Sequence, residues 1–417
     1  MYTVFKFGGA SIKDVESIIN VGEILKSYAN DELVIVFSAM GKVTNMLELV
    51  VDYYIQKNGD PFLALQKVKF FHAEIINKLF DQQDLVFDEV NNLFVEIEWV
   101  LEEEPNQNHA YVYDQIVSIG EFLSSKIMSA FLTKIGFKNC LLDARDLIKT
   151  DNSYRDAKIE WKKTVSCIKG QIKAKHCITQ GFLGCTSENF TTTLGREGSD
   201  FSAAILAFAL DSKKVIIWKD VPGMMNADPK YFKNPRLLEK ISFDEAIELA
   251  YFGAQIIHPK TIQPLKKKKI PLIIKSFIDL ESKGSQIGEG ISTFPKIPSF
   301  IIKKNQTLIS VSDTSLSFIV ETHISKIFAL LAKHCVSVNM MQNSAVSFSL
   351  CVDDDRYKIP LLISDLQNDF AVYYNKKLSL CTIRHYTKDS ENDFLKDKEV
   401  LLEQRSRNTL QLVVADA

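Results

Sequence analysis

Short apolar segments alternate with helical patterns through the first 280 residues, and this alternation limits the chain to a small set of folds. Val4–Phe7 and Leu33–Phe37 are largely apolar, and each is followed by a turn and by apolar residues at helical spacing. Similar runs recur at Cys177–Phe182, Val215–Trp218 and Leu272–Ile274. Strands that alternate with helices form largely parallel sheets with helices on both faces. We therefore expect an α/β domain with a buried, mostly parallel sheet.

The pattern changes in the last third of the chain. Residues 60–135 read as helices, and residues 281–299, with three Gly, two Pro and four Ser, read as a linker. The following segments have the β-α-β-β-α-β order of a ferredoxin-like α+β module. Its expected strands are Leu308–Val311, Val336–Met341, Val346–Val352 and Ala371–Tyr374, and its helices are His323–His334 and Tyr357–Leu366. Further strands are expected at Leu378–His385, Val400–Glu403 and Leu410–Val414. They indicate a second, abbreviated copy without its last helix.

Charge and cysteine content restrict the partners and the compartment. The chain has 50 Lys and Arg against 52 Asp and Glu, so its net charge of −2 gives no electrostatic reason to bind nucleic acid or an anionic membrane. The basic run at residues 266–269 is interpreted as a solvated helix end, with a nucleic-acid patch as the minor alternative. None of the seven cysteines forms a C-x-x-C pair, which argues against a zinc site or a disulfide framework. We expect a cytoplasmic protein without a signal segment or a membrane span.

The first motif with chemical content is Lys6-Phe7-Gly8-Gly9-Ala10-Ser11, a strand end, a glycine turn and a helix start. Because Gly8 and Gly9 have no side chains, backbone N–H groups there can approach phosphate oxygens, and a helix N-terminus adds positive potential. Lys6 can neutralise charge on a transferring group. An ordinary strand-to-helix turn explains the same residues, so the motif alone leaves phosphate binding open. We expect Ser11 to precede the helix and Asp14 to lie in its first turn.

The second motif, Thr191–Asp200, reads Thr-Thr-Thr-Leu-Gly-Arg-Glu-Gly-Ser-Asp and leads into the apolar stretch Phe201–Leu210. Ser199 can be the N-cap of that helix, and Asp200 can favour its first turn through the helix dipole. Neither structural role explains two flanking glycines and an arginine. The planar fork of Arg196 suits a carboxylate, which favours a binding role.

A third group of residues follows the expected strand Val215–Trp218. Residues 219–223 (Lys-Asp-Val-Pro-Gly) and 228–229 (Asp-Pro) are plain turns by themselves, but they lie at the carboxyl end of a strand, where open α/β sheets bind ligands. Ser242 and Glu245 have the spacing of a capping box and are interpreted as structural. His258 precedes a proline and is interpreted as a packed loop histidine rather than a base.

Together these segments resemble the aspartate kinases, members of the amino acid kinase family. The resemblance rests on seven segments in one order: KFGGAS (6–11), SAMGKVTN (38–45), SIGEFLSS (118–125), TTLGREGSD (192–200), WKDVPG (218–223), ADPK (227–230) and GAQIIHP (253–259). The tail is similar to the tandem ACT modules of the same family, notably at residues 337–339 and 344–347. The resemblance implies a kinase catalytic domain at 1–284, a linker at 285–299, an ACT-like regulatory domain at 300–377 and an abbreviated second ACT-like module at 378–417.

The resemblance also implies a role for each matching residue. In the catalytic pair, Lys6 stabilises the transferring phosphoryl group and Asp200 orients Lys6. The phosphate and ATP positions are Gly8, Gly9, Ser38, Lys219, Asp220, Met225, Lys230 and Gln255. The aspartate positions are Thr44, Glu121 for the ammonium group, Arg196 for the carboxylate, and Ser199. The regulatory positions are Val338, Asn339 and Ser344. No metal site made of protein ligands alone is expected.

The activity implied is that of an aspartate kinase. The γ-phosphoryl group of ATP, with Mg²⁺, passes to the β-carboxylate of L-aspartate to give 4-phospho-L-aspartate, the first step of lysine, threonine and methionine biosynthesis. A carboxylate is already a nucleophile at neutral pH, so positioning and cations suffice. The alternatives are a sibling kinase for another small carboxylate or phosphate, and an amino-acid-sensing protein with an inactive kinase domain. Expected partners are aspartate, ATP, an amino-acid effector at the ACT region, and a second copy of the chain in a homodimer.

The sequence departs from the family pattern mainly on the nucleotide side. Met225, Lys230 and Gln255 stand where the family often has Tyr, Arg and Lys, and Lys219 replaces the usual Thr. We expect Lys219 either to restore the charge lost at Gln255 or to point to solvent. Asn339 and Ala345 stand where lysine-inhibited members carry acids, so the sequence leaves the identity of the effector open.

Overall fold

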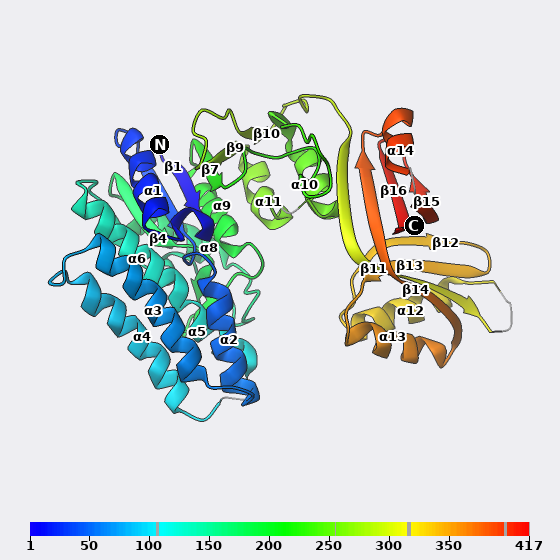
Figure 1. Ribbon diagram of the computed structural model, residues 1–417, viewed down its shortest axis with the longest axis horizontal. Coiled ribbons are helices and arrows are strands. Elements are labelled where there is room, and N and C mark those ends of the chain that lie inside the picture. The colour runs from blue at the N-terminus through cyan, green and yellow to red at the C-terminus, as the bar shows by residue number, and fades with distance from the viewer. Residues whose placement is uncertain (106–107, 255, 315–317, 396–397, 417) are drawn as a thin grey trace. The chain divides into compact units, whose positions relative to one another are not determined.

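The structure, a computed structural model, describes residues 1–105, 108–254, 256–314, 318–395 and 398–416 (Figure 1). They form two compact units. The second unit comprises Met225–Arg236, Glu248–Ala254 and Pro295–Ala417, and the first unit comprises the rest of the chain.

The first unit is built on an eight-stranded sheet with the order β3-β4-β2-β1-β7-β9-β10-β8. Its strands are β1 (Thr3–Phe7), β2 (Leu33–Phe37), β3 (Cys140–Leu142), β4 (His176–Gln180), β7 (Lys214–Lys219), β8 (Lys240–Ser242), β9 (Leu272–Ser276) and β10 (Ser285–Gly288). Every pairing is parallel except that of β9 with β10. Two short strands, β5 (Leu183–Cys185) and β6 (Thr191–Thr193), form a separate hairpin. The predicted buried, largely parallel sheet is confirmed.

Helices cover this sheet. They are α1 (Val15–Ser27), α2 (Val43–Gln56), α3 (Pro61–Leu79), α4 (Val86–Glu102), α5 (His109–Val117), α6 (Ile119–Lys134), α7 (Ala144–Leu147), α8 (Trp161–Gln171), α9 (Gly198–Leu210), α10 (Phe243–Phe252) and α11 (Pro259–Lys268). The predicted helical character of residues 60–135 is confirmed. The stretch His109–Lys134 is long and apolar enough to cross a membrane by length and composition alone, but 78% of its most apolar window is buried inside the protein. A buried core helix of a globular domain has the same composition.

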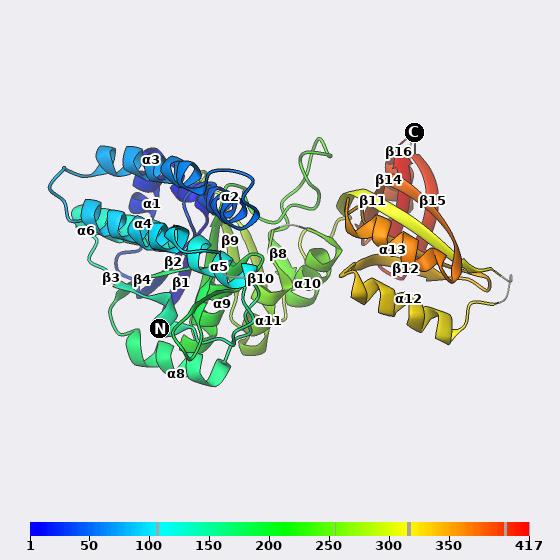
Figure 2. The same cartoon turned by 90° about the horizontal axis from the view of Figure 1, so that it is seen from below.

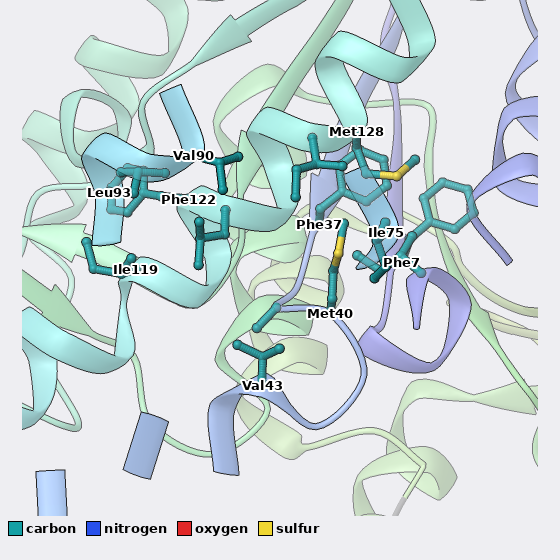
Figure 3. Close-up of a cluster of buried hydrophobic side chains, with 14 of the residues drawn as sticks. Phe7, Phe37, Met40, Val43, Ile75, Val90, Leu93, Ile119, Phe122 and Met128 are labelled. Carbon is teal, nitrogen blue, oxygen red and sulfur yellow. The ribbon is translucent and has the colours of Figure 1, made fainter. Parts of the chain in front are cut away.

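Side chains alternate between the two faces of the sheet along β1 and β7, so one face packs into the core and the other carries the lysines. Phe5 and Phe7 pack into the core with helices α1 to α6, part of which Figure 3 shows around Phe7, Phe37 and Met40. The Phe7 ring stacks on Trp218 with centroids 5.8 Å apart. Because successive side chains of a strand point to opposite faces, Lys6 lies on the other face. Lys6 pairs with Ile217, so Lys219, two residues further along β7, shares the face of Lys6.

The start of α1 differs from the prediction. Ser11 lies in a short 3-10 turn, Gly9–Ile12, where its hydroxyl donates to Gly8 O at 2.6 Å. The helix begins at Val15, and Asp14 is its N-cap, accepting from Ser17 N at 2.8 Å. The prediction that Ser11 directly precedes the helix was therefore wrong. The glycine turn needs the Ser11 hydroxyl to close it, which leaves Asp14 to satisfy the free N–H groups of the helix.

The second unit contains a six-stranded antiparallel sheet with the order β12-β13-β11-β14-β16-β15. Its strands are β11 (Ser299–Asp313), β12 (Val338–Asn343), β13 (Ser347–Asp353), β14 (Phe370–Arg384), β15 (Lys398–Arg405) and β16 (Thr409–Asp416). Helices α12 (Glu321–Lys333) and α13 (Lys358–Gln367) pack on one face of β11, β13 and β14 through a shared apolar core. Figure 2 shows both helices beside these strands. This part has the predicted ferredoxin-like order.

The two ACT-like copies are not separate. The strands expected at Ala371–Tyr374 and Leu378–His385 are one continuous strand, β14, which pairs with the equally long β11 along both copies. The predicted boundary at residue 377 therefore falls inside a strand. The polar residues 375–377 look like a turn in the sequence, but they form an irregularity in the ladder, where Lys377 and Asn305 both have left-handed backbone conformations.

Two further expectations about the tail need correction. The segment 285–299 is not only a linker, because Ser285–Gly288 forms β10 and pairs with β8 and β9 of the first unit. A short helix, α14 (Lys388–Leu395), was not predicted, and Phe394 from it packs against Ile383 and Leu410. Its sequence is too polar for the apolar spacing to show a helix.

Candidate active site

A cavity of about 380 Å³ opens where β1, β2 and β7 end. Ligands bind at the carboxyl ends of strands in open α/β sheets, so this is the expected edge of the sheet. The lining residues are Lys6, Ser38, Thr44, Tyr113, Glu121, Arg155, Phe182, Gly195, Arg196, Glu197, Gly198, Ser199, Asp200 and Lys219. All of them belong to the first unit.

Two lysines meet one carboxylate at the centre of this cavity. Lys6 Nζ lies 2.7 Å from Asp200 Oδ1, and Lys219 Nζ lies 3.1 Å from Asp200 Oδ2. Asp200 is 1% exposed. Burial alone would raise the pKa of Asp200, but the two ammonium groups outweigh it and hold the pKa below its ordinary value. One carboxylate thus fixes two cations of adjacent strands, and Lys219 points into the cavity rather than to solvent.

The start of α9 places Asp200 and its neighbours. The helix begins at Gly198, with Glu197 at the N-cap position in a left-handed conformation (φ 53°) and no side-chain cap bond. Ser199 is therefore inside the helix and is not its cap. Glu197 faces the cavity, and within the described part of the chain its buried Oε2 has no hydrogen-bond partner. Burial raises the pKa of Glu197. Non-glycine residues hold such a backbone only where the surroundings enforce it, and they cluster at functional sites.

Glu121 is a buried carboxylate with one partner missing. It is 3% exposed, and its Oε1 accepts a hydrogen bond from Ala39 N at 3.2 Å. Its Oε2 has no hydrogen-bond partner among the residues that the structure describes. Burial raises the pKa of Glu121 to about 8, although Lys6 and the Ala39 N–H act in the opposite direction. A cation that enters the cavity can supply the missing partner.

The glycine turn after β1 owes its sequence to close backbone packing. A Cβ at Gly9 would lie 2.7 Å from both Ala39 O and Gly41 O, and Gly41 N donates to Gly9 O at 3.0 Å. Gly9 is therefore required by the loop that follows β2. A Cβ at Gly8 would lie 3.5 Å from Lys6 Nζ. Because glycine has no Cβ, the approach to that ammonium group stays open.

The cavity brings together eight of the predicted site residues, which are far apart in the sequence. They are Lys6, Ser38, Thr44, Glu121, Arg196, Ser199, Asp200 and Lys219. Among the described residues, Gly8, Gly9 and Asp220 are not part of its lining. Met225 and Lys230 belong to the second unit, and Gln255 lies outside the described residues.

Four lining residues were not singled out by the sequence: Tyr113, Arg155, Phe182 and Glu197. Glu197 stood inside a recognised motif and was passed over between two glycines. Tyr113 lies on α5, where its spacing reads as core. Phe182 and Arg155 lie outside the motifs, and no local pattern marks them.

The predicted regulatory residues lie at one edge of the second sheet. Asn339 accepts from Lys303 Nζ at 2.9 Å and donates to Gln306 Oε1 at 2.8 Å and to Asp353 Oδ1 at 3.0 Å. Val338 is half-buried at the start of β12, and Ser344 is in the exposed turn after it. Their regulatory role stays a prediction.

Within the described residues, no group of three His, Cys, Asp or Glu side chains is placed to hold a metal ion. The central carboxylate, Asp200, is already engaged by two lysines. Protein residues alone therefore do not fit a Mg²⁺ site, and any Mg²⁺ here must take its ligands from the phosphates of a nucleotide and from water.

The sequence profile described as the amino acid kinase family matches residues 1–276. The chain is 29% identical over 354 residues to the lysine-sensitive aspartokinase 3 of Escherichia coli (strain K12), covering 84% of this chain and 78% of that protein. It is 30% identical over 367 residues to the chloroplastic aspartokinase 1 of Arabidopsis thaliana, covering 85% of this chain but only 63% of that relative.

Solved structures agree with these sequences. The chain matches E. coli aspartokinase III in complex with aspartate and ADP with a TM-score of 0.85 at 25% identity, over 100% of this chain and 96% of that one. The same enzyme in complex with lysine and aspartate matches with a TM-score of 0.82 at 26% identity, over 99% of this chain and 96% of that one.

Proposed function

Since the chain belongs to the amino acid kinase family, we propose that it is an aspartate kinase, which transfers the γ-phosphoryl group of ATP to the β-carboxylate of L-aspartate. The product is 4-phospho-L-aspartate. Relatives with this name match most of the chain, and a matching structure binds aspartate and ADP. The observation that carries the proposal is the Lys6–Asp200–Lys219 cluster in a cavity that also holds Arg196 and Glu121.

Lys6 acts on the transferring group in this proposal. Its ammonium is fixed by Asp200 at 2.7 Å, on the ligand-binding edge of the sheet. Phosphoryl transfer needs positioned cations for the charge on the moving group and needs little covalent chemistry from the protein. Because the ammonium group of Lys6 is already held in place, it reorganises little as negative charge develops on the transferring phosphoryl group. Asp200 is a positioning residue, since it acts through the lysines.

The remaining predicted residues divide between two substrates. The Oε2 of Glu121, which has no hydrogen-bond partner among the described residues, is the group for the ammonium of aspartate, and Arg196, Thr44 and Ser199 bind its carboxylate. The phosphates of ATP contact Gly8, Gly9, Ser38 and Lys219, and Asp220 is assigned to the nucleotide. The resemblance to the family also assigns Met225, Lys230 and Gln255 to ATP binding. When bound together with ATP, Mg²⁺ would offset the negative charge of the phosphates.

Regulation and assembly are assigned to the C-terminal residues. We propose a catalytic domain at 1–284, an ACT-like domain at 300–377 and a shortened ACT-like module at 378–417, whose shared strands join the two modules into one sheet. We assign the binding of an amino-acid effector to the region of Val338, Asn339 and Ser344, and the matching E. coli aspartokinase III has been solved in complex with lysine and aspartate. The protein is a cytoplasmic homodimer that serves lysine, threonine and methionine biosynthesis.

A coupled assay of ADP release with a panel of amino acids tests the activity. Aspartate should be the preferred acceptor, and hydroxylamine should trap the product as the hydroxamate. Lys6→Ala should lower kcat by about two to three orders of magnitude, which is the typical loss when one such transition-state contact is removed. The unfolding temperature reports whether that variant still folds.

Absence of turnover with every amino acid, in protein that binds ATP, would favour the alternative of a sensor with an inactive kinase domain. Preference for another small carboxylate would favour a sibling kinase. The Lys6–Asp200 pair argues against the inactive alternative, because a domain without catalysis has no need to keep a buried lysine on a carboxylate. Repeating the assay with lysine, threonine and methionine tests the effector.

A further inference from the structure

Arg155 is an exposed residue whose backbone is unusually well fixed. Its φ of 67° is left-handed, a conformation that is uncommon for residues other than glycine. Its N–H donates to both oxygens of Asp114, at 3.2 and 3.0 Å. Asp114 is fully buried and also accepts from the N–H and the hydroxyl of Thr193, at 2.8 and 2.7 Å. A buried carboxylate thus ties the Arg155 loop to β6, at the beginning of the second motif.

The side chain of Arg155 is directed as well. Its guanidinium carbon lies 4.1 Å from the centroid of the Tyr113 ring, and the Tyr113 hydroxyl donates to Glu48 at 2.8 Å. Stacking on a ring whose own position is fixed restricts the guanidinium to one side of the loop. That side is the active-site cavity, which Arg155 and Tyr113 both line.

The charges in the cavity show which cations are free. Lys6 and Lys219 are both bound by Asp200. Neither Arg155 nor Arg196 has a carboxylate within ion-pairing distance, as far as the described ranges of the chain go. Both arginines line the same cavity, and the backbone of the two loops is close, because a Cβ at Gly195, next to Arg196, would lie 3.1 Å from Arg155 O. Two guanidinium forks in the lining of one cavity suit a ligand with more than one carboxylate.

We propose that Arg155 is a second carboxylate-binding residue of the active site and helps select a dicarboxylic amino acid. This inference rests on the proposed function and adds a substrate contact to it. Arg155 and Arg196 together take the two carboxylates of aspartate, while Glu121 takes its ammonium group. Arg155 donates one or two charge-assisted hydrogen bonds to a carboxylate of the substrate. A monocarboxylic amino acid has no second carboxylate to accept them.

Arg155→Gly tests the proposal without straining the fold. Glycine adopts a left-handed backbone at no steric cost, so the loop and its bonds to Asp114 can persist. The KM for aspartate should rise about tenfold, as expected for loss of one charge-assisted hydrogen bond. The inhibition constant of succinate, which has two carboxylates and no ammonium group, should rise by a similar factor. The KM for ATP should stay within about twofold of the wild-type value, since the nucleotide side is untouched.

Lys269→Gly is the matched control. Lys269 is an exposed cation with a φ of 56° that is not among the lining residues of the cavity. It should leave both the aspartate KM and the succinate constant unchanged. Arg155→Lys, which keeps the charge and loses the fork, should give an intermediate KM for aspartate.

Three outcomes would overturn the inference while the wild type phosphorylates aspartate: no change in the aspartate KM of Arg155→Gly, a change confined to ATP, or a rise in the aspartate KM with succinate inhibition unaltered. If the wild type itself does not phosphorylate aspartate, the proposed function fails instead. Weaker succinate binding in Arg155→Gly would then still support a dicarboxylate site.

Discussion

Lys219 is the residue at which the structure adds most to the expectation from sequence. It was expected either to serve the nucleotide or to point to solvent, and it lies in the cavity with its ammonium on Asp200. Burial would lower the pKa of Lys219, but Asp200 and Glu197 raise it above its ordinary value, so the side chain is charged at neutral pH. A charged lysine beside Lys6 can meet the phosphates of ATP once a nucleotide shares the cavity.

Lys219→Thr should therefore raise the KM for ATP several-fold and leave the KM for aspartate within about twofold, because one phosphate contact is lost while Lys6 keeps its place on Asp200. Steady-state kinetics with each substrate varied in turn measures both constants. Gln255→Lys, at a position outside the described residues, should restore much of the loss. Normal ATP binding by the single variant would mean that Lys219 only balances the charge of Asp200.

The buried Glu121 lowers the stability of the folded protein at high pH and provides a group that binds the ligand. Its pKa of about 8 in the folded protein is far above the ordinary value, so the folded protein holds this proton more tightly than the unfolded chain does. The associated stability is fully present below about pH 4.5 and is lost as the pH rises through 8. Above that range the site carries a buried negative charge that only a ligand can compensate.

Glu121→Gln should thus unfold at a higher temperature than the wild type at pH 9, with little difference at pH 5, because the amide cannot ionise. It should also lose most of the stabilisation that added aspartate gives the wild type. Scanning calorimetry at both pH values, with and without aspartate, measures this. Glu102→Gln, at the exposed end of α4, is the control and should show neither effect. A variant less stable than the wild type at pH 9 would contradict the assignment.

Helix α3 contains a buried histidine that the active site does not use. The Nδ1 of His72 is 2.8 Å from Val68 O, one turn earlier, and its ring packs edge-on against Phe71 and Phe94. Its Nε2 finds no hydrogen-bond partner in the described ranges of the chain. Burial lowers the pKa of His72 to about 4, so the folded protein keeps this ring neutral where the unfolded chain would protonate it.

The stability contributed by neutral His72 is present above pH 6.5 and is lost as the pH falls towards 4. One such group changes the free energy of unfolding by at most about 1.4 kcal/mol per pH unit. Urea denaturation at pH 7, 6 and 5 should show a flatter pH dependence for His72→Leu than for the wild type. His109→Leu, at the partly exposed start of α5, should retain the wild-type slope. Equal slopes for His72→Leu and the wild type would place the pH dependence elsewhere.

On the scale of the whole molecule, the second sheet leaves two edges to be accounted for. Its outer strands are β12 and β15, and unpaired edges favour association with another chain. The continuous strands β11 and β14 run through both ACT-like modules, so the two modules share one sheet. We expect a homodimer formed through residues 300–417.

Sedimentation velocity should give twice the mass of the chain. A truncation after Phe294 should be monomeric or poorly soluble, because it removes the whole second sheet and keeps β10 in the first. Cutting near Ser285, which the sequence alone favours, would remove β10 and unfold the edge of the first sheet. A truncated protein that sediments as the same dimer would place the interface in the first unit.

The sequence by itself determined the α/β sheet, the ferredoxin-like order of the tail and eight lining residues of the cavity. Periodicity of apolar residues is a local signal, so it locates strands such as β1 and β2 within one or two residues. The resemblance of short motifs then groups Lys6, Arg196 and Asp200, although nearly 200 residues separate the first from the last.

Only the tertiary structure decided which neighbours these motifs have. Arg155 reaches the cavity because Asp114 joins the Arg155 loop to Thr193. Asp114 and Thr193 are 79 residues apart in the chain, and no local pattern encodes such a contact. Asp14 rather than Ser11 caps α1, because the glycine turn takes the Ser11 hydroxyl. Residues 375–377 continue β14 because β11 supplies partners on both sides of them. In each case a hydrogen bond to a particular neighbour selects among conformations that the local sequence allows equally.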